Sequence, residues 1–440
     1  MEKEEKTNKK FTQSITFKVL TIVALTLFLL IPKVMVTGLI EERQARSKET
    51  IRKINEKWSE AQTLCGPVLT VPYSCKVVEY ETVNKETREK VRYQRKWLTI
   101  TPSVLHIKAE LLPEQRYYGI YKTTLYRSEL HISGSFNNLD ELENLDNENT
   151  HWNEAYITVG ISDLKGLVSD AELTLNDKSY SAEAEGSTSW FNGNTLKISL
   201  KNFEKSPDKK NEFSCKLTLN GSEDINFIPV GRTTGVEVSG RWASPGFVGN
   251  FSPQSVVEND NFSAKWHILH FNRNIPETWD ESKAYCFDNS SFGVKLVETV
   301  DHYQQNMRSA KYALMFIVLT FVAFFFVEVL TKKKIHIIQY LLAGIALILF
   351  YSLLLSISEQ IGFALAYFIA SLATIGLIGT YVYSIFKNKM QTAIFTLILC
   401  CLYVFLYVVL QLEDLALLIG SIGLFTILGI IMYLSRKINW

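Results

Sequence analysis

The last third of the chain contains five long apolar segments separated by short polar turns, and this pattern limits the fold more than any other feature. An apolar helix of about 20 residues, rising about 1.5 Å per residue, crosses a hydrocarbon core of about 30 Å. A buried helix of a soluble protein rarely needs so long an apolar segment. The sequence therefore predicts five transmembrane helices, at residues 312–330, 335–357, 361–386, 392–410 and 415–434.

A further apolar segment, residues 17–37, follows a lysine-rich tail at residues 1–16. A basic front and an apolar middle are typical of a signal peptide, but a cleavable one needs small residues just before the cut. Met35, Val36 and Thr37 fit that requirement poorly. An uncleaved signal anchor is therefore favoured over a cleaved peptide, and the expected bundle has six spans, one plus five.

Charge placement predicts the orientation of these spans. From residue 312 onward the basic residues occupy alternate turns and the last segment, residues 435–440: they are Lys332, Lys333, Lys334, Lys387, Lys389, Arg436 and Lys437. The intervening turns carry Glu359, Glu413 and Asp414 and contain neither lysine nor arginine. Since basic turns stay inside, both termini are expected in the cytoplasm of a multi-pass protein of the bacterial inner membrane.

Residues 38–311, between the first and second spans, are then expected in the periplasm. This region begins with residues 39–64, which contain no glycine or proline and repeat apolar residues at steps of three and four. That spacing predicts a stalk helix, with a short coiled coil as the alternative. The region has a small excess of acidic over basic residues, which argues against nucleic acid as a partner.

Beyond Gly66 and Pro67 apolar residues alternate with polar ones, as in strands that have one solvated face. Strands are expected around residues 105–107, 130–132, 173–175, 196–200, 236–242 and 262–268, and polar loops at residues 140–150 and 205–211. Asn220-Gly221 lies between two apolar stretches and predicts a hairpin, because both residues accept a positive φ. The expected fold class is an α+β membrane protein with a six-helix bundle and a large antiparallel, sandwich-like periplasmic β domain.

Four cysteines fall in the expected external region: Cys65, Cys75, Cys215 and Cys286. In an oxidising compartment four cysteines allow three pairings. Cys65 and Cys75 flank a short segment and are the expected disulfide. Because no C-x-x-C spacing is present, structural cysteines are favoured over a redox or metal site.

Motifs that would indicate catalysis are missing from the sequence. It contains no H-E-x-x-H, no G-x-S-x-G, no P-loop and no G-x-G-x-x-G placed between a strand and a helix. We therefore expect no enzymatic activity, no catalytic residues, no cofactor and no metal site.

Polar residues within or beside membrane spans are candidates for function. Glu328, Gln339 and Glu359 meet this description, although Lys332 follows Glu328 by one helical turn and offers it a partner near the cytoplasmic surface. Charged residues are lacking near the midplanes, and no proline follows Pro276. Transport or flipping of an envelope precursor is therefore less favoured, but it remains the alternative function.

The aromatic segment WASPGFVGNF, with Trp242, Phe247 and Phe251, is a candidate periplasmic binding loop. The alternative, that these rings belong to the core, is favoured because aromatic residues in β domains are usually buried. The expected partners are the lipid bilayer and an unidentified periplasmic or envelope component. Small residues in the spans permit close helix packing, and a homo-oligomer is left open.

Several segments resemble the CreD family of bacterial inner-membrane proteins. In the expected bundle these are RSAKYALMFIVLTFVAFFFVE at residues 308–328 and QYLLAGIALILFYSLLLSISEQIGFALAYFIAS at residues 339–371. In the expected external region they are GPVLTVPY, YGIYKTTLYRSELHISGSF, ITVGISDLKGL and GRWASPGFVGNFSP. The resemblance covers nearly the whole chain, but the four external cysteines are not part of the family pattern.

This resemblance implies a role in cell-envelope integrity and stress response. It also implies membership of a regulon controlled by a two-component system that responds to carbon source and to β-lactams. No catalytic residue is implied by the resemblance, so the expected function is a non-enzymatic one that acts through a periplasmic interaction domain.

Overall fold

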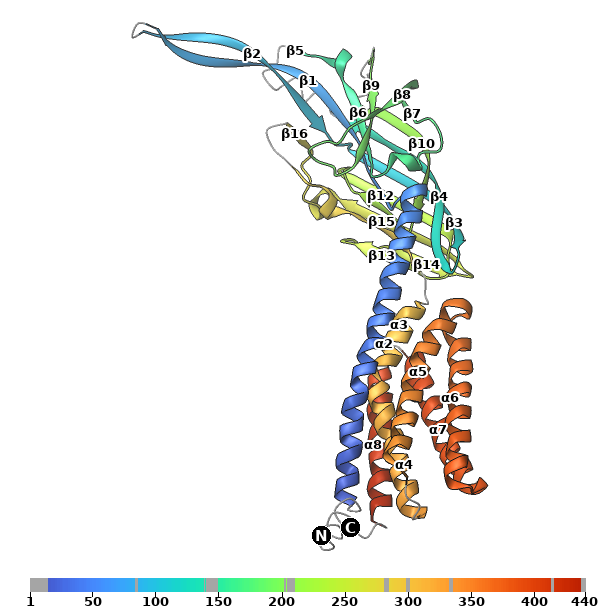
Figure 1. The fold of residues 1–440 in the computed structure, drawn as a ribbon. Helices are drawn as coiled ribbons and strands as arrows, with labels where there is room; N and C mark the ends of the chain where they lie inside the picture. The colour runs from blue at the N-terminus through green and yellow to red at the C-terminus, as the bar shows by residue number, and fades with distance from the viewer. Residues whose placement is uncertain are drawn as a thin grey trace. The chain divides into compact units, whose positions relative to one another are not determined.

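The computed structural model describes residues 15–83, 86–137, 139, 149–201, 203, 210–280, 285–297, 301–331, 335–412 and 415–436. The chain divides into two compact units (Figure 1). The helical unit comprises Met1–Glu49 and Val300–Trp440, and the β unit comprises Thr50–Thr299. Each unit is described by itself below.

Long apolar helices build the helical unit. They are α2 (Ile15–Trp58), whose last turns belong to the β unit, α3 (His302–Lys311), α4 (Ala313–Thr331), α5 (Ile337–Ile361), α6 (Phe363–Phe386), α7 (Lys389–Gln411) and α8 (Ala416–Ser435). Four of the described helices, α2, α5, α6 and α7, are long and apolar enough to cross a membrane. The pair α3 and α4, bent by 45°, makes a fifth if it is one span.

The expected six-span count stays a prediction, because the described part of α8 that is apolar, Leu418–Tyr433, is shorter than the others. The expected first span and stalk form one continuous helix, α2, which contains Pro32. This helix ends at Trp58, so the expectation that the stalk extends to residue 64 is wrong. From Gln62 the chain is the first strand of a sheet, whose hydrogen bonds exclude a helical backbone there.

Aromatic rings and small residues pack the helical unit. The rings of Phe324 on α4 and Phe395 on α7 lie 4.4 Å apart between centroids. Gly344 on α5 lies against Leu29 on α2, and a Cβ added there would come within 2.3 Å of that side chain. Ala366 and Ala370 on α6 are fully buried. Small residues thus allow close helix approach, as expected for packing in lipid.

The β unit has two sheets. One, sheet A, contains β1 (Gln62–Val83), β2 (Glu86–Ile100), β5 (Asn149–Thr150), β6 (Tyr156–Ile161), β9 (Asn194–Ser199), β11 (Asp224–Ile228), β13 (Pro245–Gly249), β16 (Thr278–Asp280) and β17 (Phe292–Leu296). The other, sheet B, contains β3 (Val104–Tyr118), β4 (Tyr121–Asn137), β7 (Glu172–Leu175), β10 (Lys210–Ser222), β12 (Thr233–Arg241), β14 (Gln254–Glu258) and β15 (Asn261–Leu269). A last strand, β8 (Lys178–Glu185), pairs with β7 of sheet B and with β9 of sheet A.

Most strand pairs are antiparallel, as expected, but two are parallel, so the expected antiparallel domain is corrected to a mixed one. Strand β12 runs parallel to β3, and β1 runs parallel to β11. Parallel neighbours require long connections, and alternation of apolar residues does not encode strand direction. The β unit therefore has mixed sheets, and sheet B has the order β14-β15-β12-β3-β4-β10-β7-β8.

A single hydrophobic core joins the two sheets. The ring of Trp266 on β15 lies 5.3 Å from that of Phe292 on β17, between centroids. Each expected strand overlaps an observed one, although those expected at 196–200 and 236–242 end one residue beyond β9 and β12, since apolar residues at every second position bury one face of a strand. The sandwich-like packing of the domain follows from this shared core.

The hairpin expected at Asn220-Gly221 is wrong. Both residues lie inside β10, and the positive φ of 61° falls on Glu223. The next strand, β11, belongs to the other sheet. A Cβ added to Gly221 would come within 2.3 Å of the Tyr126 hydroxyl, so this glycine permits a close approach of a ring instead of a turn.

Candidate functional site

The carboxylate of Glu328 is the most buried charge among the candidate residues. It lies on α4 and is 5% exposed. One oxygen accepts a hydrogen bond from the main-chain N–H of Ile335 at 3.1 Å and forms an ion pair with Lys18 of α2. The other oxygen accepts a hydrogen bond from the Tyr340 hydroxyl of α5 at 3.0 Å. The carboxylate therefore ties three helices together, whereas its expected partner, Lys332, lies outside the described residues.

Gln339 and Glu359 lie at opposite ends of α5. The side chain of Gln339 accepts a hydrogen bond from the main-chain N–H of His336 at 3.0 Å and so caps the start of the helix. Glu359, half-buried, accepts one from the Tyr303 hydroxyl at 3.1 Å. Twenty residues of helix separate the two by about 30 Å. The structure thus does not bring Glu359 together with the other two candidates.

Aromatic rings of α5, α6 and α7 pack together between those ends. Phe350, in the middle of α5, lies 4.9 Å from the Tyr403 ring of α7 and 5.5 Å from the Tyr367 ring of α6, between centroids. The Tyr367 hydroxyl donates a hydrogen bond to the main-chain oxygen of Tyr403 at 2.8 Å. Phe350, Tyr367 and Tyr403 form an aromatic layer, and Phe350 lies on α5 between Gln339 and Glu359.

The aromatic residues of the candidate binding loop pack onto the core of the β unit. Phe247 meets Trp266 edge to face, with centroids 6.1 Å apart, and Phe251 meets Phe292 in the same way at 5.6 Å. The indole N–H of Trp242 donates a hydrogen bond to the main-chain oxygen of Val297 at 3.1 Å. All three candidates are half-buried. The core alternative therefore describes them better than a free binding loop.

The disulfide expected between Cys65 and Cys75 is wrong. Both thiols are free, and both residues belong to β1. Ten residues of extended strand separate them by about 30 Å, far beyond the Cα distance of about 6 Å that a disulfide needs. Burial, with a smaller contribution from Asp288, raises the pKa of the Cys65 thiol. Burial likewise raises the pKa of Cys215 to about 12, so both are unreactive structural thiols.

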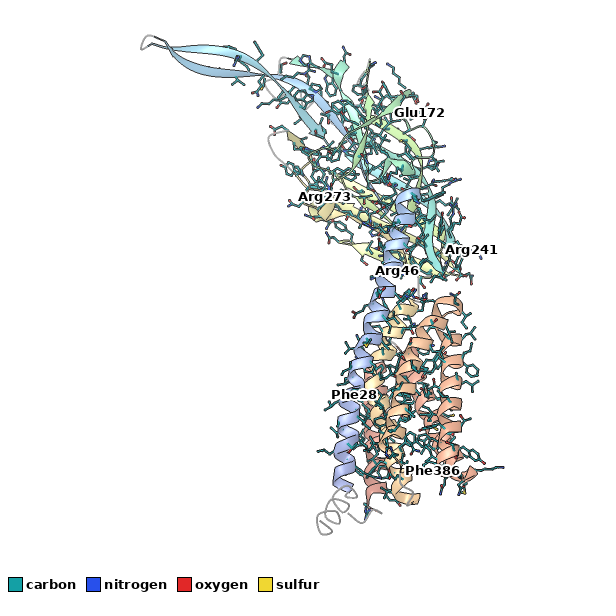
Figure 2. All side chains as sticks on the ribbon, in the orientation of Figure 1. Phe28, Arg46, Glu172, Arg241, Arg273 and Phe386 are labelled. Atoms are coloured by element: carbon teal, nitrogen blue, oxygen red, sulfur yellow. The ribbon has the colours of Figure 1, made fainter. Side chains whose placement is uncertain are left out.

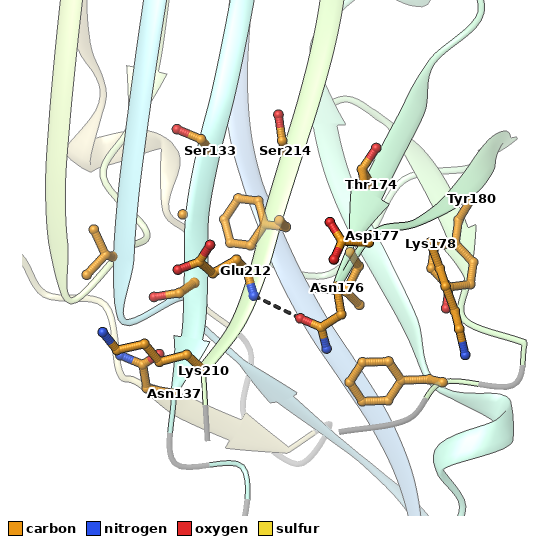
Figure 3. Close-up of a pocket in the computed structure, with 16 residues that line it drawn as sticks. Ser133, Asn137, Thr174, Asn176, Asp177, Lys178, Tyr180, Lys210, Glu212 and Ser214 are labelled. Carbon is orange, nitrogen blue, oxygen red and sulfur yellow. Dashed lines mark hydrogen bonds between the residues drawn. The ribbon is translucent and has the colours of Figure 1, made fainter. Parts of the chain in front are cut away.

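Sheet B carries a polar groove with a volume of about 950 Å³ (Figure 3). Its base is a row of hydroxyls across three neighbouring strands. Ser133 of β4 is directly opposite Ser214 of β10, and Ser214 is directly opposite Thr174 of β7. Neighbouring strands lie about 4.8 Å apart, so the row presents hydroxyls at a regular spacing.

Charged and amide side chains extend this surface. In the same register Glu212 is opposite Ser135, and Lys210 is opposite Asn137. The floor is closely packed beneath them, because a Cβ added to Gly134 would come within 2.0 Å of the main-chain oxygen of Val104. Larger side chains are therefore excluded from this part of the floor.

A two-residue turn forms one wall of the groove. Asn176 and Asp177 join β7 to β8 with φ values of 47° and 65°, as in the tight turns that suit hairpins. The Asn176 amide donates a hydrogen bond to Asn211 at 2.9 Å and accepts one from the main-chain N–H of Glu212 at 3.1 Å. Figure 3 shows the second of these bonds beside Asp177. The turn is thus fixed on β10 before any ligand binds.

The sequence did not reveal this groove. Ser133 and Ser214 are 81 positions apart and become neighbours only through the register of β4 and β10. The local signal that was available is Asn176-Asp177, since this dipeptide accepts the positive φ values of a hairpin turn. Among the residues the structure describes, no group of three or more histidine, cysteine or acidic side chains is placed to hold a metal ion.

These features define a class: an α+β membrane protein that combines a packed helical unit with a mixed-sheet unit bearing a polar groove. Comparison with known proteins places the chain more narrowly. The family model described as inner membrane protein CreD matches residues 14–440. Inner membrane protein CreD of Escherichia coli (strain K12) is 30% identical over 430 residues, which cover 96% of this chain and 93% of that protein.

The chain therefore belongs to the CreD family, and the resemblance seen in the sequence is confirmed. With its several apolar helices, it is a multi-pass protein of the inner membrane.

Proposed function

We propose that this CreD-family protein maintains the cell envelope without catalysis, with the β unit in the periplasm contacting an envelope component and the helical unit as its membrane anchor. In this proposal six spans, the first an uncleaved signal anchor, leave both termini in the cytoplasm. The distribution of basic and acidic turns supports that orientation. The proposal includes a role in stress response, within a regulon that responds to carbon source and β-lactams.

The observation that carries this proposal is the preorganised polar groove. A concave surface of about 950 Å³ with a fixed turn at its wall has the size and rigidity of a binding site. The aromatic layer in the helical unit is consistent with an anchor. Binding in the β unit and anchoring in the membrane together describe an interaction protein.

The placement of the β unit can be tested through Cys286, which is exposed. A membrane-impermeant maleimide, added to reduced spheroplasts of cells that make the full chain, is expected to label Cys286 before the membrane is opened. A Cys286→Ser variant gives the background from Cys75. Labelling that requires permeabilised membranes would place the β unit in the cytoplasm and contradict the proposal.

Contact with an envelope component can be tested by photo-crosslinking in intact cells. A photoreactive amino acid at Lys178, on the groove wall, is expected to give an adduct with an envelope component. The same probe at Asp260, exposed in another turn of the β unit, is the control. Equal adducts from both positions, or adducts only with cytoplasmic proteins, would contradict the proposal.

Transport of an envelope precursor is the second candidate, and the buried Glu328 favours it, because ionisable groups in membrane spans often belong to transport pathways. If Glu328 carries a translocated proton or ion, Glu328→Gln should abolish complementation of a deletion strain while the protein still accumulates in the membrane. If the carboxylate only joins helices, complementation should follow the amount of folded protein.

A further inference from the structure

The free hydrogen-bonding groups of the groove on sheet B indicate what it binds. Two polar atoms of its lining are buried and have no partner among the described residues: the side-chain oxygen of Asn137, an acceptor, and the hydroxyl of Tyr180, a donor. A buried polar atom without a partner destabilises the fold unless a ligand or water satisfies it. Both atoms are buried, so a ligand reaches them only when their side chains turn toward the groove, and a group that both donates and accepts then satisfies both.

The charges of the groove narrow the ligand class. The lining contains two acidic residues, Asp177 and Glu212, and two basic residues, Lys178 and Lys210, so the described lining has no net charge. A site for a polyanion or a polycation would carry an excess of one sign. The lining is also mostly polar, whereas sites for apolar small molecules are lined mainly by hydrophobic side chains. A neutral ligand rich in hydroxyl groups fits both observations.

The shape of the groove favours a chain of several rings. Its volume of about 950 Å³ lies at the upper end of the range of about 300–1,000 Å³ that small-molecule sites occupy. The hydroxyls of Ser133, Ser214 and Thr174 are repeated at the strand spacing, which matches a ligand that repeats its own hydroxyls. The half-buried Tyr180 adds apolar surface for the C–H face of such a ring.

We propose that the groove on sheet B binds a neutral oligosaccharide. Its sugar hydroxyls donate to Asp177 and Glu212 and accept from Lys178 and Lys210, while the fixed Asn176-Asp177 turn holds one wall in place. This inference rests on the proposed function, since it names the envelope component as a glycan. The two are tested separately, because sugar binding is measured with the purified chain, whereas the proposed function is tested in cells.

The chain contains a matched control for the turn. Asn259 and Asp260 join β14 to β15 with φ values of 50° and 62°, and Asp260 does not line the groove. Asp177→Gly and Asp260→Gly therefore remove the same side chain from the same kind of turn. Glycine accepts the positive φ, so neither change strains the backbone. Glu110, exposed on β3 and outside the groove, is the matching control for Glu212.

The test uses the full chain in lipid nanodiscs and isothermal titration with three neutral tetrasaccharides: chitotetraose, cellotetraose and maltotetraose. At least one is expected to bind, and Asp177→Gly with Glu212→Ala should weaken it by about tenfold or more, because hydrogen bonds to charged groups are lost. The double control, Asp260→Gly with Glu110→Ala, should leave the affinity unchanged. Thermal unfolding of both double variants checks that they fold. If the groove double variant does not fold, Asp177→Gly alone replaces it in the titration.

Two results would overturn the inference: no binding of any tetrasaccharide at millimolar concentration, or equal affinities for the groove variant and the control. A protein adduct from the probe at Lys178, together with no sugar binding, would reject the oligosaccharide but keep the proposed function. Labelling of Cys286 only after permeabilisation would reject the proposed function whatever the sugars do.

Discussion

The helical unit and the β unit each bury a charged side chain, and they satisfy it in different ways. Glu328 in the helical unit, 5% exposed, lies against the opposite charge of Lys18. Arg273 in the β unit, 8% exposed and labelled in Figure 2, has no acidic partner at its nitrogens among the described contacts. Its guanidinium donates to the main-chain oxygens of Val230 at 2.8 Å, Gly231 at 3.1 Å, and Ile275.

The difference follows from which backbone N–H and C=O groups lack a partner in each unit. In a membrane helix every interior N–H donates within its own helix, and lipid supplies no water, so the Glu328 carboxylate takes its donors from the side chains of Lys18 and Tyr340 and from the N–H of Ile335, which lies just before α5. In the β unit Val230, Gly231 and Ile275 lie between strands, where their carbonyls have no ladder partner. Burial lowers the pKa of Arg273 to about 10, against an opposing effect of Glu277, so the side chain stays charged at neutral pH.

The largest expected effect tests the charge pair of the helical unit. Lys18→Met leaves Glu328 buried without its countercharge and should lower the free energy of unfolding by about 3 kcal/mol. Removing one partner of a buried ion pair costs about 3–5 kcal/mol, and the lower value applies because Lys18 is partly exposed. Thermal unfolding of the full chain in detergent, followed by tryptophan fluorescence, measures the loss. Lys18→Met with Glu328→Leu removes both charges and should recover most of it. Equal destabilisation by the single and double changes would break the comparison.

The next effect tests the carbonyl shell of the β unit. Arg273→Met keeps the bulk of the side chain but leaves the oxygens of Val230 and Ile275 without this donor, while Gly231 still accepts from the Thr234 hydroxyl; it should cost about 2–3 kcal/mol. Arg273→Lys should recover only part of the lost stability, because an ammonium group lacks the planar guanidinium fork that reaches all three oxygens. Thermal unfolding of the two variants gives the ranking. A lysine variant as stable as the original chain would show that charge alone suffices.

Removing the charge of Asp224 is expected to have a smaller effect and to stabilise the chain. Its neighbours offset only part of the cost of burying this carboxylate. Burial, with a smaller contribution from Glu223, raises its pKa, and Lys295 and the hydrogen bond from Asn226 lower it only in part. The charged form is thus less favoured in the folded state. Stability from this group is present in full below its unfolded pKa of about 3.9 and is lost as the pH rises through the raised folded value.

Asp224→Asn should therefore stabilise the chain at neutral pH, by about 1 kcal/mol or less, and lose that advantage in acid. Melting temperatures of the variant and the original chain, compared at pH 7 and near pH 4, check the sign. Stabilisation that is the same at both pH values would rule out titration of Asp224 as its cause.

The smallest effect tests a charge at a helix end. Tyr303→Phe removes the hydroxyl that donates to the half-buried Glu359 and should cost about 0.5–1 kcal/mol, because water can replace the lost partner. Tyr340→Phe, which removes the donor to the buried Glu328, is the matched control and should cost more. Melting temperatures in one detergent decide the order. Equal losses would show that burial does not set the strength of these bonds.

Local patterns were enough to predict many elements of the fold. Apolar length predicted the helices at residues 337–361, 363–386 and 389–411, and alternation predicted strands such as β3 and β15. Both patterns depend only on residues a few positions apart, because burial of one face repeats with the period of the local backbone. The CreD resemblance was also readable from contiguous segments and is confirmed over residues 14–440.

Pairing between distant segments could not be predicted in this way. Asn220-Gly221 has the local properties of a turn, but the ring of Tyr126 occupies the space that a side chain at Gly221 would need. Cys65 and Cys75 are close in sequence, but the single extended strand that holds both keeps them apart. In each case the tertiary environment decided between conformations that the local sequence allowed.

The sequence by itself determined that this chain has apolar helices, β strands and membership of the CreD family. Only the tertiary structure decided that Lys18 is a partner of Glu328, that two strand pairs are parallel, and that hydroxyls from β4, β10 and β7 form one row. The physical reason is that helical and strand periods are set by neighbouring residues, whereas register and ion pairing are set by burial across segments tens to hundreds of residues apart.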